Sequence, residues 1–175
     1  MSSIDLVILG MVAEGPKSAY DIQRDVAYHH LDRWSGVSAP SIYKKVLRLK
    51  ADGYLYSRTV RGERLADKAI YALTEKGRRR FEELMQACAE EAVPLQFDFN
   101  VLVANLNKLE KPQAAALISR LRESLNQSAW VNAAQAAEYP DLPLTGQAIF
   151  DQQQRLYRAL LEWLDAFEAR FHGEG

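Results

Sequence analysis

The sequence predicts a mainly α-helical protein with one small β-hairpin. Apolar residues recur at helical spacing along most of the 175-residue chain. Residues 54–73 differ, because two runs rich in aromatic and β-branched residues there flank a polar loop. Charge also divides the chain: residues 1–80 hold 15 Lys/Arg and 9 Asp/Glu, residues 81–175 hold 7 and 14, and the resulting +6 and −7 sum to −1. We therefore expect two domains, a basic one over residues 1–92 and an acidic helical one over residues 93–175.

The first two helices are predicted from their boundaries. An apolar helix begins near Ile4 and ends at the Gly15-Pro16 pair, a strong stop signal. Ser18 then caps a second helix, and Asp21 three residues later completes a capping box in which Asp replaces the usual Glu. Residues 29–37 are expected to form a turn region with a buried Trp34.

The third helix is predicted to begin at the N-cap Ser38, with Pro40 in its first turn, where a missing N–H costs nothing. Its apolar stripe is formed by residues four and three apart: Ile42, Val46 and Leu49. Polar and basic residues fall on another face: Ser41, Lys44, Lys45 and Arg48. Gly53 is expected to end this helix at the C′ position.

A two-stranded hairpin should follow, with strands over residues 54–60 and 68–73 and a polar loop over residues 61–67. Its basic residues are Arg58, Arg61, Arg64 and Lys68. Thr74 caps a further helix, which Pro94 ends. The order helix, turn, helix, hairpin is that of a winged helix-turn-helix, the hairpin being the wing.

This arrangement indicates binding to double-stranded DNA, because cations contact phosphates and short polar side chains reach base edges. The predicted contacts are Ser41, Lys44, Lys45 and Arg48 in the groove and Arg61, Arg64 and Lys68 on the wing. Tyr43 and Tyr20 have two interpretations, packing between helices or a bond to phosphate, and packing is favoured for Tyr43. Either the basic helix face or the basic hairpin by itself would be explained as a charged surface that faces solvent. The two elements together, in this order, favour binding to DNA.

The remainder of the chain is predicted to be helical, over residues 97–109, 112–138 and from about 146 onward. In the last helix, apolar or seam positions alternate steps of four and three: Ile149, Gln153, Leu156, Leu160, Trp163, Phe167 and then Arg170 or Phe171. This heptad spacing predicts a homodimer held by Leu156, Leu160, Trp163 and Phe167. Trp130 and Trp163 are interpreted as interface anchors. The alternative is that they line a pocket for a small aromatic effector.

Other kinds of chemistry lack support in the sequence. His29 and His30 are adjacent and cannot form a helical metal pair, and we expect no metal and no cofactor. There is neither a phosphate-binding glycine loop nor a nucleophile elbow, so we do not expect an enzyme. No apolar run is long enough for a membrane span and no secretory signal is visible. Cys88 is the only cysteine, which fits the cytoplasm.

These residues resemble the PadR family of bacterial winged-helix transcriptional regulators. The resemblance rests on LVILGMVAEGPKSAYDIQRDV, VSAPSIYKKVLRLKADGYL and IYALTEKGRRRF. The segment PLQFDFNVLVANLNKLEKPQAAALISRL is similar to the helical domain of the AphA-like branch. The resemblance to this family implies a homodimer that is held together by the C-terminal helices. Each winged helix would then bind one half-site. Some relatives respond to small aromatic molecules, whereas AphA-like ones often have no known ligand. Ala19 replaces a common glycine of the family, and the wing RGERLAD is poorer in Gly, Pro and Arg.

Three hypotheses follow from the sequence. The first is a cytoplasmic, dimeric, sequence-specific DNA-binding regulator acting on a pseudo-palindromic operator. The second is a winged-helix protein–protein adaptor, because the wing is only modestly basic and the isoelectric point is about 6.3. The third is an effector-responsive sensor with a small aromatic ligand at the dimer interface.

Overall fold

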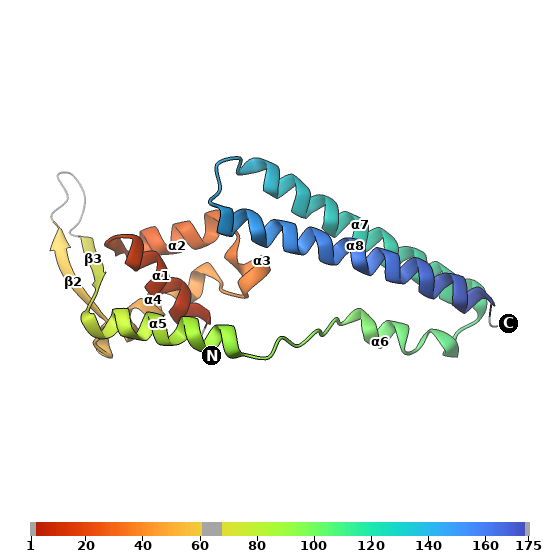
Figure 1. Ribbon diagram of the computed structural model, residues 1–175, viewed down its shortest axis with the longest axis horizontal. Coiled ribbons are helices and arrows are strands. Elements are labelled where there is room, and N and C mark those ends of the chain that lie inside the picture. The colour runs from red at the N-terminus through yellow and green to blue at the C-terminus, as the bar shows by residue number, and fades with distance from the viewer. Residues whose placement is uncertain (1–2, 61–67, 174–175) are drawn as a thin grey trace. The chain divides into compact units, whose positions relative to one another are not determined.

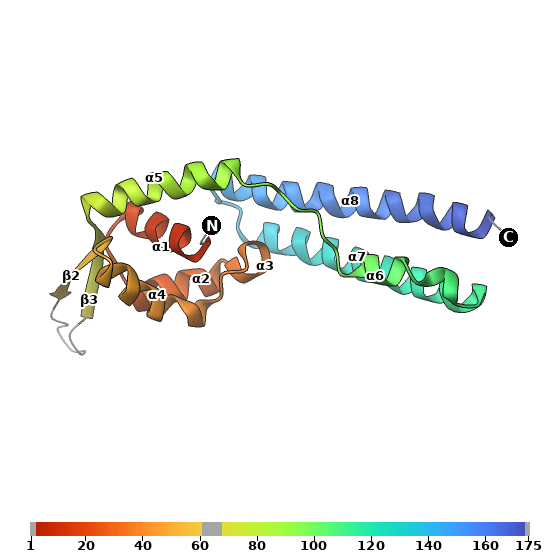
Figure 2. The same ribbon diagram turned by 90° about the horizontal axis from the view of Figure 1, so that it is seen from below.

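The computed structural model describes residues 3–60 and 68–173 and divides the chain into two compact units, Met1–Val93 and Pro94–Gly175. Figures 1 and 2 show both units from two directions, and each unit is considered by itself. The predicted fold class is confirmed: helices dominate, and the strands form one small antiparallel sheet. Among the helices described, none is long and apolar enough to cross a membrane.

The N-terminal unit has eight elements in the described residues: α1 (Ser3–Glu14), β1 (Lys17–Ser18), α2 (Ala19–Tyr28), α3 (Leu31–Ser35), α4 (Ala39–Ala51), β2 (Leu55–Val60), β3 (Lys68–Leu73) and α5 (Glu75–Glu90). Helix α1 lies between α5 on one side and the α2–α4 pair on the other (Figure 2). Ile8 and Leu9 of α1, Ile22 of α2 and Ile42 and Val46 of α4 are fully buried together. Burial of this apolar face is the main force that holds the helices around one core.

The sheet has the order β1-β3-β2, with β3 paired antiparallel to both neighbours. The predicted hairpin of β2 and β3 is confirmed, and Tyr71 and Leu73 of β3 face the core. Strand β1 was not predicted, because two residues carry too little periodicity to be recognised. Its pairing of Ser18 with Ile70 closes a loop that contains α2, α3, α4 and β2.

Helix α4 ends as predicted at Gly53, which has a φ of +77°. The Gly53 N–H donates to the Lys50 carbonyl at 3.0 Å, and the Tyr54 N–H donates to the Leu49 carbonyl at 2.9 Å. These two bonds form a Schellman motif, which satisfies the last carbonyls of a helix and requires a left-handed residue at C′. The motif turns the chain directly from α4 into β2.

Thr74 and Gly77 join the sheet to α5. The Thr74 hydroxyl donates to the Gly53 carbonyl at 2.8 Å and accepts from the Gly77 N–H at 2.9 Å, which confirms Thr74 as the cap. A Cβ built on Gly77 would lie 2.1 Å from the Tyr54 carbonyl oxygen. Backbone therefore meets backbone at this point, and the position excludes any side chain.

The segment between α2 and α4 differs from the prediction. Residues 31–35 form the short helix α3, between His30 with a φ of 48° and Gly36 with a φ of 69°. The prediction that Trp34 is buried is wrong, since 41% of it is exposed. Leu31 and Val37 fill the core there instead, and their smaller side chains fit beside the α2–α4 contact.

The C-terminal unit contains α6 (Phe99–Val103), a 3-10 turn (Leu106–Lys108), α7 (Lys111–Glu138) and α8 (Leu144–Gly173). Helices α7 and α8 run antiparallel, side by side (Figure 1). Their shared core contains Leu106, Ala114, Ile118, Leu125 and Leu164. The predicted helix over residues 97–109 is broken in two around Ala104 and Asn105, whereas the two long helices were predicted correctly.

The residues of the predicted dimer seam of α8 fall into two groups, one that faces the core of the unit and one that is exposed. Leu160 and Phe167 are partly buried and pack against the core of their own α7–α8 pair. Leu156 and Trp163 are 44% and 38% exposed. Trp163 stacks on Phe167 with ring centroids 5.8 Å apart, and Phe99 lies 5.9 Å from it on the other side. The heptad pattern thus partly reports contacts within the chain.

Replacement of Gly77 by alanine should destabilise the N-terminal unit. Alanine normally stabilises a helix by about 1 kcal/mol relative to glycine. Because the new Cβ would overlap the Tyr54 carbonyl, we expect Gly77→Ala to lower the free energy of unfolding by roughly 2 kcal/mol. Chemical denaturation followed by circular dichroism measures the change. Gly10→Ala in α1 is the matched control, since its Cβ would meet only a side-chain atom, Phe81 Cε2 at 3.4 Å. A stabilised Gly77→Ala protein would contradict the described junction.

Candidate nucleic-acid interface

The outer face of α4 carries one continuous exposed stripe. Its residues are spaced three and four apart: Pro40, Tyr43, Lys44, Leu47 and Arg48. Ile42, Val46 and Leu49 lie on the opposite side and are buried, which confirms the predicted apolar stripe. The exposed face of α4 therefore combines two cations, a phenol and an aliphatic side chain. The buried face of the same helix packs on the core.

Lys45 does not lie on this exposed face. Its ammonium is 2.8 Å from Asp5 Oδ1, and both side chains are partly buried between α4 and α1. Ser41 is also only half exposed, and its hydroxyl donates to the Ser38 carbonyl at 2.6 Å. The predicted face of Ser41, Lys44, Lys45 and Arg48 is therefore corrected, because the apolar stripe turns Ser41 and Lys45 to the edges of the helix.

Lys44 and Arg48 occupy the centre of the exposed stripe. Arg48 Nε donates to Asp52 Oδ2 at 3.0 Å, one turn further along α4. Both side chains of this pair are exposed, so the pair contributes little to stability and opens readily. Lys44 is exposed and has no ion-pair partner among the residues that the structure describes. Within the exposed stripe, Lys44 is the cation that can meet a phosphate without first leaving a carboxylate.

Two tyrosines add hydroxyl groups to the same surface. Tyr43 is 58% exposed, so its side chain packs against other residues only in part, and both partial packing and a bond to phosphate stay open. Tyr20 in the first turn of α2 is exposed as well. Burial raises the pKa of Tyr71, and the neighbouring Tyr43 phenol raises it further. Contacts between α4 and β2 place the sheet beside α4.

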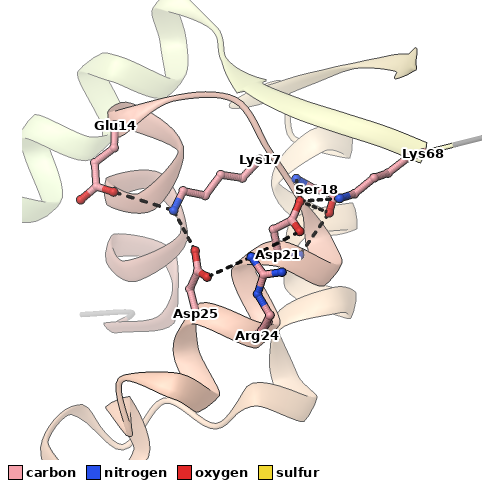
Figure 3. A network of polar contacts seen from close by, with 7 residues as sticks. All are labelled: Glu14, Lys17, Ser18, Asp21, Arg24, Asp25 and Lys68. Carbon is pink, nitrogen blue, oxygen red and sulfur yellow. Dashed lines mark hydrogen bonds and ion pairs between the residues drawn. The ribbon is translucent and has the colours of Figure 1, made fainter. Parts of the chain in front are cut away.

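Asp21 ties the start of α2 to the base of the wing (Figure 3). Its carboxylate accepts from the Ser18 hydroxyl at 2.7 Å and from Lys68 Nζ at 2.6 Å, and its backbone N–H donates to Ser18 Oγ at 3.1 Å. This is the predicted capping box with one added cation. The hydrogen bonds from Lys68 and Ser18 lower the pKa of Asp21 to about 2. Lys68, predicted as a wing contact, is thus paired within the chain.

A second group of charges continues along α2. Lys17 is 2.8 Å from Asp25, and Arg24 lies 3.7 to 3.8 Å from Asp25 and Asp21 (Figure 3). The Arg24 side chain is largely exposed and lies one turn after Tyr20 on the same face of α2. The sequence interpretation did not select Arg24, although its spacing of four from the exposed Tyr20 was a signal for it.

The remaining predicted positions divide between described and undescribed residues. Arg58 of β2 is exposed. Arg61 and Arg64 lie outside the described residues and stay predictions. Within the described part of the chain, no group of three or more His, Cys, Asp or Glu side chains could hold a metal ion.

Helix α2, the α3 turn, the exposed helix α4 and the β2–β3 wing together define a winged helix-turn-helix domain. A family model described as "Transcriptional regulator PadR-like family" matches residues 8–83, from within α1 into α5. Residues 8–83 of the N-terminal unit therefore match this family of transcriptional regulators, which agrees with the resemblance noted in the sequence. The family is one of DNA-binding regulators and not of enzymes.

Solved structures show the same fold over nearly the whole chain. Bacillus subtilis PadR, in complex with operator DNA and in complex with p-coumaric acid, is 18% identical with a TM-score of 0.78, over 97% of this chain and 98% of that chain. The Vibrio cholerae virulence activator AphA is 14% identical with a TM-score of 0.68, over 98% and 99% of the two chains. The TM-scores establish a shared fold, and sequence identities this low show the fold alone. No curated protein matches the chain.

The Asp21 carboxylate should give the domain a pH-dependent stability. Its pKa falls from 3.8 to about 2 in the folded state, so its contribution is complete above the unfolded value and disappears as the pH falls through the folded one. We expect Asp21→Asn to lower the free energy of unfolding by roughly 1–2 kcal/mol at pH 7. The difference from wild type should shrink as the pH is lowered from about 4 to about 2.

Urea denaturation at a series of pH values measures this difference. Asp32→Asn, at an exposed carboxylate of α3, is the control and should stay within about 0.5 kcal/mol of wild type. A difference between Asp21→Asn and wild type that stays constant down to the lowest pH would show that Asp21 is not held by Lys68.

Proposed function

We propose that this PadR-like regulator is a cytoplasmic homodimer that binds a pseudo-palindromic operator in double-stranded DNA. The observation that carries the proposal is the exposed α4 stripe, which stands beside the wing on a domain of this family. A helix of this kind fits the major groove of B-DNA. The operator complex of Bacillus subtilis PadR, a protein of the same fold, supports the same use of this domain.

Within this proposal, α4 lies in the major groove and divides its contacts by chemistry. Lys44 and Arg48 bind phosphates or guanine edges, and the Tyr43 hydroxyl bonds to a phosphate oxygen. Leu47, exposed one turn from Tyr43, contacts a thymine methyl group, the apolar feature of that groove. Ser41 and Lys45 contribute from the edges, Lys45 only by exchanging Asp5 for a phosphate. Tyr20 lies where α2 meets the backbone.

The wing contacts the flanking backbone or minor groove through Arg61 and Arg64. Lys68 has a different role in this proposal, because Asp21 holds it at 2.6 Å. It positions the wing relative to α2 and shares its charge between Asp21 and the nearest phosphate. Removal of a shared cation affects binding less than removal of an unpaired one, so Lys68 should contribute less than Lys44.

The C-terminal unit is proposed to form the dimer. Leu156 and Trp163 are exposed on the seam of α8, and Leu160 and Phe167 support them from the core of the helix pair. Burial of large apolar side chains at a two-fold axis is the usual source of dimer stability. A two-fold dimer places its α4 helices on half-sites about 10 bp apart or a multiple of that distance.

Removal of Lys44, the unpaired cation of the exposed α4 stripe, should change the salt dependence of DNA binding. For each phosphate that the protein no longer neutralises, the slope of log K against log salt falls in magnitude by about 0.9. We expect that reduction for Lys44→Ala and a smaller one for Lys45→Ala, because Asp5 already neutralises Lys45. Fluorescence anisotropy with a genomic operator fragment at several salt concentrations measures the slopes. Lys111→Ala at the start of α7 removes the same charge from the other unit and is the control.

This measurement also separates the regulator from the adaptor hypothesis. An adaptor that does not use DNA would show no salt-dependent binding to mixed genomic fragments. If fragments are bound but Lys44→Ala and Lys45→Ala both keep the wild-type slope, α4 does not enter the groove.

A charge introduced on the dimer seam should separate the subunits. Leu156 lies outside the core of its own helix pair, so Leu156→Asp leaves the fold intact and buries a carboxylate only in the dimer. We expect the dissociation constant of the dimer to rise roughly tenfold or more. Sedimentation equilibrium measures it. Ala169→Asp adds the same charge at an exposed position of α8 away from the seam and should leave it unchanged. An unaltered dimer in Leu156→Asp would exclude this face.

A further inference from the structure

The ion pair between Lys45 and Asp5 joins the edge of α4 to a helix outside the exposed stripe. The ammonium is 2.8 Å from Asp5 Oδ1, and the side chains of Lys45 and Asp5 are 30% and 14% exposed. Asp5 belongs to the first turn of α1, where the partial positive charge of a helix N-terminus favours a carboxylate. A cation of the helix proposed to enter the groove is therefore held by a fixed negative charge on another helix.

Asp5 depends on its cation more than Asp21 depends on Lys68. Asp5 Oδ1 is buried and receives no hydrogen bond from a described residue, so the ion pair with Lys45 compensates its charge. Asp21 has a second partner, because the Ser18 hydroxyl donates to it at 2.7 Å and stays when Lys68 leaves. Removal of the cation from a buried pair is strongly destabilising, since it leaves an uncompensated charge. Lys45 should therefore leave its carboxylate less readily than Lys68.

The position of Lys45 on the helix does not itself keep it from the exposed stripe. Lys45 precedes Arg48 by three residues on α4, and side chains three apart on a helix are neighbours. Arg48 is exposed, and so is its partner Asp52, so that pair opens readily. The burial of the partner carboxylate is what distinguishes Lys45 from its neighbour on the stripe.

We propose that Asp5 limits the affinity of this protein for DNA by holding Lys45 away from phosphates. This inference rests on the proposed function, in which α4 lies in the major groove. A phosphate that takes Lys45 leaves a buried carboxylate without its cation, which costs more than opening an exposed pair. Asp5 does not contact DNA and acts through Lys45, so it is a positioning residue. Loss of its charge releases Lys45 and tightens binding.

Asp5→Asn tests the proposal, because asparagine has the shape of aspartate without its charge. Fluorescence anisotropy of the full-length protein uses a labelled mixed-sequence duplex of about 30 bp, roughly three helical turns. One added phosphate contact should raise the magnitude of the slope of log K against log salt by about 0.9. The affinity of Asp5→Asn relative to wild type should then grow roughly threefold as salt falls from about 200 to about 50 mM. A loss of stability would not tighten binding, so a merely structural role of Asp5 would not give this result.

Two controls show whether the gain comes from Lys45. Asp32→Asn, at an exposed carboxylate of α3, makes the same change of net charge and should leave the slope within about 0.3 of wild type. In the Asp5→Asn background, Lys45→Ala should remove the whole gain. In the wild-type background, the same substitution should reduce the slope much less. Such a double-mutant cycle isolates the coupling between the two residues from their separate effects.

The outcomes separate this inference from the function on which it rests. Wild-type binding with an unchanged slope for Asp5→Asn would overturn the role of Asp5 and leave the proposed function intact. A gain that persists after Lys45→Ala would also overturn that role, because net charge alone would explain it. If neither wild type nor Asp5→Asn binds the duplex, both proposals fail. If circular dichroism shows that Asp5→Asn does not fold, Lys45→Ala alone decides: a full reduction of about 0.9 in slope would show that Asp5 does not withhold the lysine.

Discussion

The N-terminal unit depends on a contact between three pieces of backbone. The Schellman end of α4 delivers Tyr54 to the sheet, and the Tyr54 carbonyl accepts from the Thr74 N–H at 3.1 Å and lies against Gly77. This carbonyl thus fixes the end of α4, the start of β2 and the first turn of α5 at one place. Because backbone hydrogen bonds join the three segments and the contact admits no side chain, α4 and the strands of the wing keep a defined relation. A surface that reads DNA needs this constancy, since a groove accepts only a narrow range of helix positions.

Much of the domain could be predicted because its signals are local. Ser18 and Thr74 cap their helices through bonds to Asp21 and Gly77, three residues further on, and Gly53 acts through its own backbone angle, so spacing reveals these roles. Strand β1 and the pairs Lys45–Asp5 and Asp21–Lys68 join residues that are distant in sequence. Sequence periodicity does not reveal such distant partners. The prediction therefore placed Lys45 on the exposed face of α4, whereas the structure pairs it with Asp5 at the edge of the helix.

The long-range ion pairs also change what the basic surface can do. Lys45, Arg48 and Lys68 each have a carboxylate within 3.0 Å. Phosphates must compete with these carboxylates, so the positive charge of the domain overstates its attraction to arbitrary DNA. Leu47 of the stripe, which is proposed to contact a thymine methyl group, does not depend on charge. In the proposed complex this balance shifts binding toward contacts that distinguish bases, which suits a regulator that must leave most of a chromosome unoccupied.

The pairing of β1 with β3 has a consequence for the order of events during synthesis. Ser18 meets Ile70 only after the intervening chain has been made, and closure of so long a loop is slow compared with helix formation. Helices α2 and α4 can form earlier, but their core also needs Tyr71 and Leu73 of β3 and Leu84 of α5. A nascent chain that stops within the wing therefore carries α4 without a folded domain behind it. The exposed α4 stripe becomes part of a folded domain only in a late step, when β3 and α5 have left the ribosome.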